Sequence, residues 1–194
     1  MTTHLATRDR AASVDLALVA ALAALIAVCS ILPAINVSAF APITLQTFGV
    51  LLAGAVLGAR RGAMAVVLWI GVGVAGLPVF ANGKAGLAVI SGPTGGYIIG
   101  MVVGAAVIGT VATALARRSG TPGAAALFAG GLLAVALIHG AGIVGLHLRA
   151  DLDWTAAATV DAAFWIGDLI KLAATAAVAA AVHRAFPWLL RRGS

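Results

Sequence analysis

The chain has 194 residues, of which 62% are hydrophobic and 9% are charged, and its mean hydropathy is +1.12. This composition excludes an ordinary soluble domain and predicts a single-domain integral membrane protein with about six short-looped helices. The net charge of +6 comes mostly from arginines at the ends of apolar segments, so it reflects membrane topology rather than nucleic-acid binding. No room remains for an ATPase domain, so any energy-driven work must draw on a partner protein.

Six apolar segments predict an all-α fold of six transmembrane helices. Their approximate bounds are residues 14–32, 47–57, 62–76, 95–116, 123–148 and 156–183. The connection at 33–46 carries Pro33 and Pro42, and the connection at 77–94 combines glycines with apolar side chains. A loop this apolar is expected to dip between helices, where irregular backbone is buried or lines a cavity.

Two of the predicted helices carry small residues at regular spacing. On the first helix Ala17, Ala20, Ala21 and Ala24 recur three or four residues apart, which predicts a smooth surface. That surface fits either packing within the chain or docking of another membrane subunit. On the fourth helix glycines at 92, 96, 100 and 104 allow close approach of a neighbouring backbone or of a flat ligand, and we favour packing. The single Cys29 is interpreted as a small buried side chain.

The basic residues predict the orientation of the helices. With alternating helix ends, most arginines fall on one side of the membrane: Arg8, Arg10, Arg60, Arg61, Arg117, Arg118, Arg184, Arg191 and Arg192. Lys84 and Arg149 fall on the other side. The positive-inside rule therefore predicts cytoplasmic N- and C-termini, with the long loops at 33–46 and 77–94 facing outward.

Asp168 and Lys171 lie near the middle of the last apolar segment. A charge at the centre of a membrane helix costs roughly 2.5–3.5 kcal/mol even on lenient insertion scales, so it is expected to face the protein interior or a cavity. At helical spacing the pair shares a stripe with Asp161, Phe164 and Trp165. The pattern fits a polar ligand site with aromatic walls, and also an internal ion pair that joins helices.

The remaining polar residues suit binding better than catalysis. The sequence contains no recognisable hydrolase, metalloprotease or nucleotide-binding motif. His139 and His147 lack partners for a metal site and are interpreted as hydrogen-bonded helix histidines, so we predict no metal and no cofactor. Asp161 could line the cavity, but a solvated position near the membrane surface is expected. Donors and acceptors without a nucleophile–base pair are offered by Thr44, Gln46, Asn82, Lys84, Thr94 and Tyr97.

Four motifs resemble one known family in order and spacing. They are Pro-Ile-Thr-Leu-Gln-Thr-Phe-Gly at 42–49, Gly-Leu-Pro-Val-Phe at 76–80, Gly-Pro-Thr-Gly-Gly-Tyr at 92–97 and Gly-Asp-x-x-Lys at 167–171. Together they make the chain similar to the BioY family from about residue 12 to residue 182. Members of this family are the biotin-specific substrate-capture subunits, or S-components, of energy-coupling factor (ECF) transporters.

This resemblance implies a fold, a ligand and partners. It implies a six-helix S-component fold in the cytoplasmic membrane of a prokaryote, and high-affinity capture of biotin near the outer face. It also implies a transmembrane coupling subunit and two cytoplasmic ATPase subunits as partners, with the alanine face of the first helix as the docking surface. The alternatives are an S-component for another vitamin, such as thiamin or riboflavin, and an integral membrane enzyme acting on lipid.

The resemblance also implies roles for individual residues. Asp168 and Lys171 match the family's ligand-contacting pair, and Gln46 matches a lid-like first loop. Further residues expected at the site are Asn82, Lys84, Thr94, Tyr97 and Trp165. The second loop departs from the common Gly-Gly-x-Gly-Gly pattern, because this chain reads Asn-Gly-Lys-Ala-Gly at 82–86. Lys84 could meet a ligand carboxylate or face water, so the group that recognises the carboxylate is left open.

Overall fold

The computed structural model describes residues 2–35, 40 and 42–190, with side chains from residue 12 onward. Within these residues the fold is all-helical apart from one isolated antiparallel bridge between Ile35 and Ile43. The elements are α1 (Thr2–Ile31), α2 (Gln46–Leu57), α3 (Ala59–Val74), the 3-10 turn η1 (Ala81–Gly83), α4 (Leu87–Ser91), α5 (Gly95–Ser119), α6 (Ala124–Arg149) and α7 (Trp154–Ala185).

Each predicted segment coincides with a helix, but several bounds differ. Helix α1 begins at Thr2 rather than near residue 14, and α3 begins at Ala59 because Gly58 alone, with φ of 84°, separates it from α2. The connection expected to be irregular at 77–94 contains η1 and the short helix α4. Parts of the first long connection, residues 36–39 and 41, lie outside the described residues, as do Arg191 and Arg192 and the side chains of Arg8 and Arg10.

Four helices within the described residues are long and apolar enough to cross a membrane. These segments are Ala12–Ile31, Gly95–Ser119, Ala124–Arg149 and Trp154–Ala185. The 26 residues of α6 extend about 39 Å at 1.5 Å per residue, which exceeds a hydrocarbon core of about 30 Å. The 12 residues of α2 extend only about 18 Å. The chain is thus a multi-pass helical membrane protein in which α2 and α3 are shorter than these four helices.

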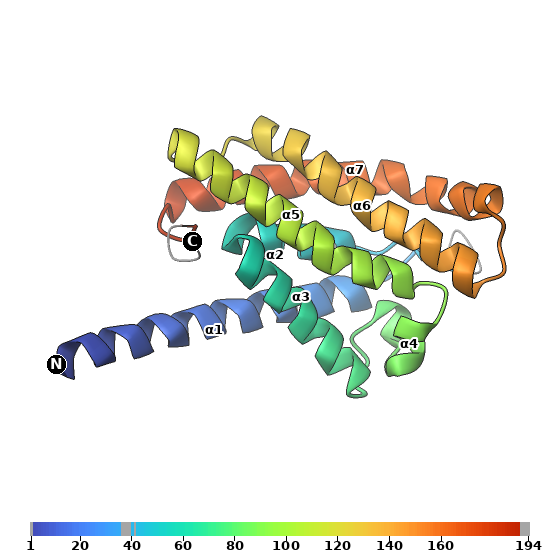
Figure 1. Ribbon diagram of the computed structural model, residues 1–194, viewed down its shortest axis with the longest axis horizontal. Coiled ribbons are helices and arrows are strands. Elements are labelled where there is room, and N and C mark those ends of the chain that lie inside the picture. The colour runs from blue at the N-terminus through green and yellow to red at the C-terminus, as the bar shows by residue number, and fades with distance from the viewer. Residues whose placement is uncertain (1, 36–39, 41, 191–194) are drawn as a thin grey trace.

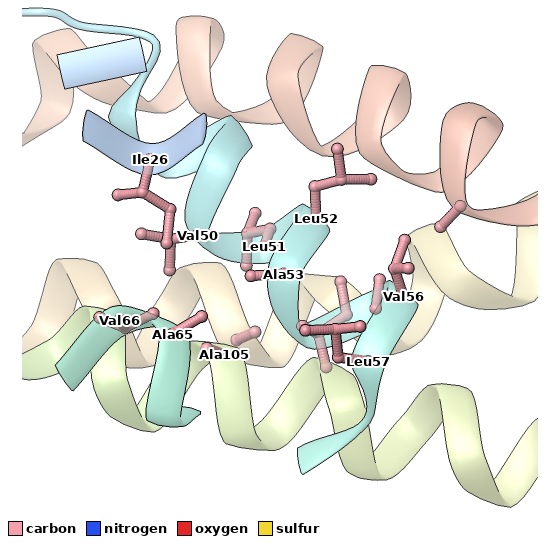
Figure 2. Packing of buried hydrophobic residues seen from close by; sticks show 14 of the residues in the cluster. Ile26, Val50, Leu51, Leu52, Ala53, Val56, Leu57, Ala65, Val66 and Ala105 are labelled. Atoms are coloured by element: carbon pink, nitrogen blue, oxygen red, sulfur yellow. The ribbon is translucent and has the colours of Figure 1, made fainter. Parts of the chain in front are cut away.

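Helix α2 forms the centre of the molecule. It packs against α1, α3, α5 and α7, and every one of its residues except Phe48 is buried. Figure 2 shows its apolar side chains directed toward Ile26 of α1, toward Ala65 and Val66 of α3 and toward Ala105 of α5. A short helix that is apolar on all sides is expected in such an enclosed position. Through this packing α2 holds α1, α3, α5 and α7 in position.

Helices α5, α6 and α7 lie side by side along the long axis of the molecule (Figure 1). The α5–α6 contact depends on the predicted glycine ladder. A Cβ atom placed at Gly100 would lie 2.9 Å from Ala141 Cβ and 3.0 Å from Ile138 Cα, and one at Gly96 would lie 2.8 Å from Gly145 Cα. Gly96, Gly100 and Gly104 therefore serve close packing against α6, as we favoured from their spacing. Gly92, which we placed in the same series, lies before the start of α5.

In the first turn of α3, Arg61 joins three segments of the chain. Its Nη1 donates to Asp15 Oδ1 of α1 at 2.7 Å, and its Nε donates to the Leu57 carbonyl at 3.0 Å. The guanidinium also donates to the carbonyl of Leu189, beyond the end of α7. The start of α1 and the end of α7 lie toward the same end of the long axis, opposite the α6–α7 turn (Figure 1).

Candidate ligand-binding site

A cavity lies where α2, α5, α6 and α7 meet under the two long loops. About 760 Å³ of this region is not filled by protein atoms, counting the part open to solvent at its mouth. The connection after α1 contributes Phe40, Pro42, Ile43 and Thr44, and the segment after α3 contributes Phe80, Ala81, Asn82, Lys84, Val89 and Thr94. The helices contribute Gln46, Thr47, Tyr97, Ile98, Met101, Ile138, His139, Phe164, Asp168 and Lys171.

The charged part of the cavity wall comes from α7. Asp168 and Lys171 are 5% and 9% exposed, and Lys171 Nζ donates to Asp168 Oδ1 at 2.6 Å. Asp168 Oδ2 accepts from Thr47 Oγ1 of α2 at 3.1 Å. The predicted ion pair is present, and both residues also line the cavity. The carboxylate is therefore held from two sides beside a space that a ligand can occupy.

Behind this pair a second buried carboxylate, Asp161, joins three helices. It accepts from Tyr97 Oη of α5 at 2.8 Å, from His139 Nδ1 of α6 at 2.8 Å and from Trp165 Nε1 of α7 at 2.9 Å. Asp161 is only 1% exposed, so the expectation of a solvated position near the membrane surface is wrong. Three donors from three helices satisfy the carboxylate, which explains how it is buried.

Aromatic rings from α5 and α7 pack close to these carboxylates. Tyr97 meets Phe164 edge to face, with ring centroids 5.9 Å apart, and both rings line the cavity. The indole of Trp165 stacks on the His139 ring at a centroid distance of 4.5 Å, and Trp165 is not among the cavity-lining residues. The cavity wall predicted from Tyr97 is present, whereas Trp165 lies against the histidine.

Hydrogen bonds hold the described ends of the first long connection, beside the cavity. Ile35 and Ile43 exchange backbone hydrogen bonds of 2.9 and 2.8 Å, so the two described ends of this connection lie together. Thr44 Oγ1 then accepts from the backbone N–H of Gln46 at 3.2 Å and donates to its side-chain Oε1 at 3.3 Å. The buried amide of Gln46, 6% exposed, reaches the cavity from the first turn of α2.

The second loop is anchored by Phe80. This ring is 1% exposed and meets Trp69 of α3 edge to face at 5.1 Å, while Trp69 Nε1 donates to the Val79 carbonyl at 2.9 Å. The backbone then turns through Asn82, which has a left-handed φ of 57° that asparagine tolerates better than most residues. Asn82 and Lys84 are exposed at the cavity mouth.

Seven of the eight predicted site residues line this one cavity, the exception being Trp165. Thr47 and His139 also line the cavity, although they were not among the predicted site residues. Thr47 directly follows the predicted Gln46, and a histidine in the middle of an apolar helix was the available signal for His139. Within the described residues no group of three or more His, Cys, Asp and Glu side chains could hold a metal ion. His147 lies apart, where it stacks on Trp154 at 4.0 Å.

This arrangement suits reversible binding. The cavity offers a carboxylate as acceptor, an ammonium as donor and aromatic rings for a flat group, all positioned by helices under two loops. Fold and site together are those of a membrane protein with a cavity suited to a small ligand that carries polar groups.

The comparisons with known proteins agree with this class. Residues 1–188 match the BioY family. The chain is 37% identical over 182 residues to a biotin transporter BioY of Rhizobium etli, which covers 92% of this chain and 97% of that protein. It is 38% identical over 190 residues to a biotin transporter BioY of Rhodobacter capsulatus, with 92% and 98% of the two chains covered.

A solved structure is also similar. The crystal structure of the S-component for biotin from an ECF-type ABC transporter matches with a TM-score of 0.82 and 26% sequence identity, covering 88% of this chain and 90% of that chain. The chain described here belongs to the BioY family. Members of this family are substrate-binding transporter subunits and not enzymes, so the lipid-enzyme alternative is set aside.

Proposed function

We propose that this protein captures biotin as the S-component of an ECF-type transporter. The observation that carries the proposal is the cavity over Asp168 and Lys171, in a chain whose full-length relatives are biotin transporters and whose fold matches a biotin S-component. Biotin has a flat ureido ring with two N–H donors and one carbonyl acceptor. A carboxylate beside an ammonium presents the complementary acceptor and donor.

We assign parts of the ligand to particular residues of the cavity. Asp168 accepts from the ureido N–H groups, and Lys171 balances its charge and donates to the ureido carbonyl. Tyr97 packs against the bicyclic ring, and Trp165 supports that ring contact from behind His139. Gln46, Thr94, Asn82 and Lys84 line the roof and mouth, where Lys84 is the cation available to a carboxylate.

The loops and the helix ends support an orientation. The cavity lies toward the end of the bundle that carries the α6–α7 turn, and the arginine-rich ends lie toward the other. By the positive-inside rule the cavity then opens outward, with both termini in the cytoplasm of a prokaryotic cell and the chain in its cytoplasmic membrane. In this assignment α2 and α3 complete six membrane segments, and their short lengths leave room for the loops that dip between helices.

Release of the ligand inward requires partners. As the likeness to an ECF-type S-component implies, a coupling subunit in the membrane and two ATPase subunits supply the energy. Ala17, Ala20, Ala21 and Ala24 are all exposed, while the other side of α1 packs against α2 and α3. This small-residue face is the proposed docking surface for the coupling subunit.

Ligand-dependent stability of the purified chain in detergent tests the substrate. A ligand of the native state at about 100 times its dissociation constant adds about 2.7 kcal/mol to the free energy of unfolding. Biotin should raise the unfolding temperature, whereas thiamin and riboflavin should not. A rise with another vitamin only would mean that the S-component fold carries a different specificity, and no rise with any of them would contradict vitamin capture.

A further inference from the structure

His139 lies between the two buried carboxylates and has no role in the ligand contacts proposed above. It is 1% exposed in the middle of α6. Its Nδ1 is 2.8 Å from Asp161 Oδ1, and its Nε2 is 3.4 Å from Asp168 Oδ2. The second contact is within ion-pair distance, although its geometry does not make a hydrogen bond. One imidazole therefore bridges the carboxylate behind the cavity and the carboxylate in its wall.

The contacts of Asp161 determine the proton on Nδ1. Tyr97 Oη and Trp165 Nε1 already donate to this carboxylate, and an ionised carboxylate only accepts. The 2.8 Å contact from His139 must therefore be an Nδ1–H donor. Nδ1 therefore carries a proton, and the question that follows is whether Nε2 carries one as well.

The position of Asp168 decides the state of Nε2. In a neutral imidazole with its proton on Nδ1, the lone pair of Nε2 would face Asp168 Oδ2 at 3.4 Å, and the two would repel. With a second proton the same contact is attractive. The charge balance agrees. If His139 is neutral, Lys171 alone offsets the two negative charges of Asp161 and Asp168. If His139 is charged, the four charges of this group sum to zero.

We propose that His139 is an imidazolium in the ligand-free protein and that this cation positions Asp168 for the ligand. Lys171 holds Asp168 Oδ1, while Thr47 and the imidazolium act on Oδ2, so the plane of the carboxylate is fixed. His139 acts through Asp168 and is therefore a positioning residue. The ligand in this inference is the biotin of the proposed function, whereas the charge on His139 does not depend on it.

The inference predicts a pH dependence with a definite sign. Among the described residues, His139 contacts Asp161 and Asp168 from α7 and Tyr97 from α5. Lys171 of α7 and the uncharged Thr47 of α2 contact Asp168. The charged imidazole is the form that orients Asp168. Biotin affinity should therefore be highest while His139 is protonated and should fall as rising pH removes that single proton.

The protonation state can be measured without any ligand. The full chain, labelled with 15N-histidine in detergent, is titrated by NMR, and the His139→Gln variant assigns the resonances of His139. Both ring nitrogens of His139 should show the protonated form at neutral pH. His183 is the internal comparison, since its Nε2 donates to the Ala55 carbonyl at 2.8 Å and no carboxylate among the described residues contacts its ring, so it should be neutral. A neutral His139 would overturn the proposal.

Biotin affinity across pH tests the consequence for binding. His139→Gln should bind biotin about tenfold or more weakly than the parent at neutral pH and should lack the decline at alkaline pH. His147→Gln, which alters a histidine outside the cavity, should match the parent in both respects. A His139→Gln variant with the parental affinity and pH profile would overturn the positioning role. If this variant does not fold, a flat pH profile in the parent would overturn it equally.

The two arms separate the inference from the function on which it rests. A parent chain that binds no biotin at any pH contradicts the proposed function, while the NMR titration still decides whether His139 is charged. If His139 is charged but the biotin affinity of the chain does not change with pH, the proposed charge is supported. The role of His139 in positioning Asp168 is then overturned.

Discussion

The two buried carboxylates, Asp168 and Asp161, have different hydrogen-bond partners. We infer from this difference that Asp168 binds the ligand and that Asp161 stabilises the fold. Asp168 has an ammonium and a hydroxyl as partners and lines the cavity, so its remaining acceptor capacity is available to a ligand. Asp161 accepts from three side chains on α5, α6 and α7 and does not line the cavity. Because an unpaired charge in a membrane helix is costly, both sets of partners are needed for folding. Asp161 therefore acts mainly on stability.

Replacement of Asp161 tests this supporting role. Asp161→Asn removes the charge and turns one acceptor into a donor that faces the donors of its neighbours. Loss of one partner of a buried pair typically costs 3–5 kcal/mol, so we expect destabilisation of about that size. Thermal unfolding in detergent without ligand measures it. Asp153→Asn is the control, because asparagine can still cap α7 through the contact with Ala156. Parental stability of Asp161→Asn would contradict the role.

Sequence spacing was sufficient for some of these residues and not for others. Asp168 and Lys171 are three residues apart on one helix, so their pairing follows from helical geometry alone. The partners of Asp161 on other helices, Tyr97 and His139, lie 64 and 22 residues away in the chain. Their meeting depends on how three helices are rotated against each other. Periodicity does not give that rotation, so Asp161 was misplaced and His139 was not connected to the site.

At the scale of the helices, α5 and α6 approach closely because glycines, which have no side chain, lie between them. Gly100→Ala would place a Cβ 3.0 Å from Ile138 Cα, a backbone atom that cannot move independently. We expect a loss of about 1–3 kcal/mol in the free energy of unfolding. Gly140→Ala, on α6, points into open space and should be neutral or gain up to about 1 kcal/mol in helix propensity. Thermal unfolding compares the two variants, and equal stability would contradict this account.

The exposed alanine face of α1 should matter for transport and not for binding. Ala20→Trp adds a large side chain to the surface proposed for the coupling subunit, without contact to the cavity. Biotin uptake by cells that express the whole transporter should fall, while biotin affinity of the purified chain stays unchanged. Ala173→Trp, at an exposed position on α7, should leave both unchanged. Normal uptake with Ala20→Trp would contradict docking at this face.

Hydrophobic patterning located the helices but not the enclosure of α2. The long apolar runs correspond to α5, α6 and α7 because a continuous run of this length permits few other structures in a membrane. Helix α2 has the same apolar character over only 12 residues, and its burial on all sides follows from tertiary packing. The short helix α4 was missed because glycines and a proline surround its five residues.

For the whole molecule, the orientation in the membrane can be tested by labelling. With Cys29 replaced by alanine, single cysteines are introduced at Ser119, the last residue of α5, and at Thr155, at the start of α7; both positions are exposed and lie at opposite ends of the bundle. A membrane-impermeant maleimide applied to spheroplasts should label Thr155→Cys. Ser119→Cys should react only after the membrane is permeabilised. The reverse pattern would contradict cytoplasmic termini.

The overall architecture could be predicted from the sequence more completely than its details. Composition established a multi-pass helical membrane protein, and four motifs in order indicated the family to which the chain belongs. The shape of the cavity did not follow from these, because residues from two loops and four helices form it.

The central claim is that biotin binds in this cavity at Asp168, and equilibrium binding to the purified chain tests it most directly. Isothermal titration with biotin should show high affinity for the parent and for Asp151→Asn, a matched change at an exposed carboxylate in the α6–α7 turn. Asp168→Asn should weaken binding by about 2–5 kcal/mol, the usual cost of truncating a buried charged contact. Unchanged biotin affinity in a folded Asp168→Asn protein would remove this residue from the site and contradict the account.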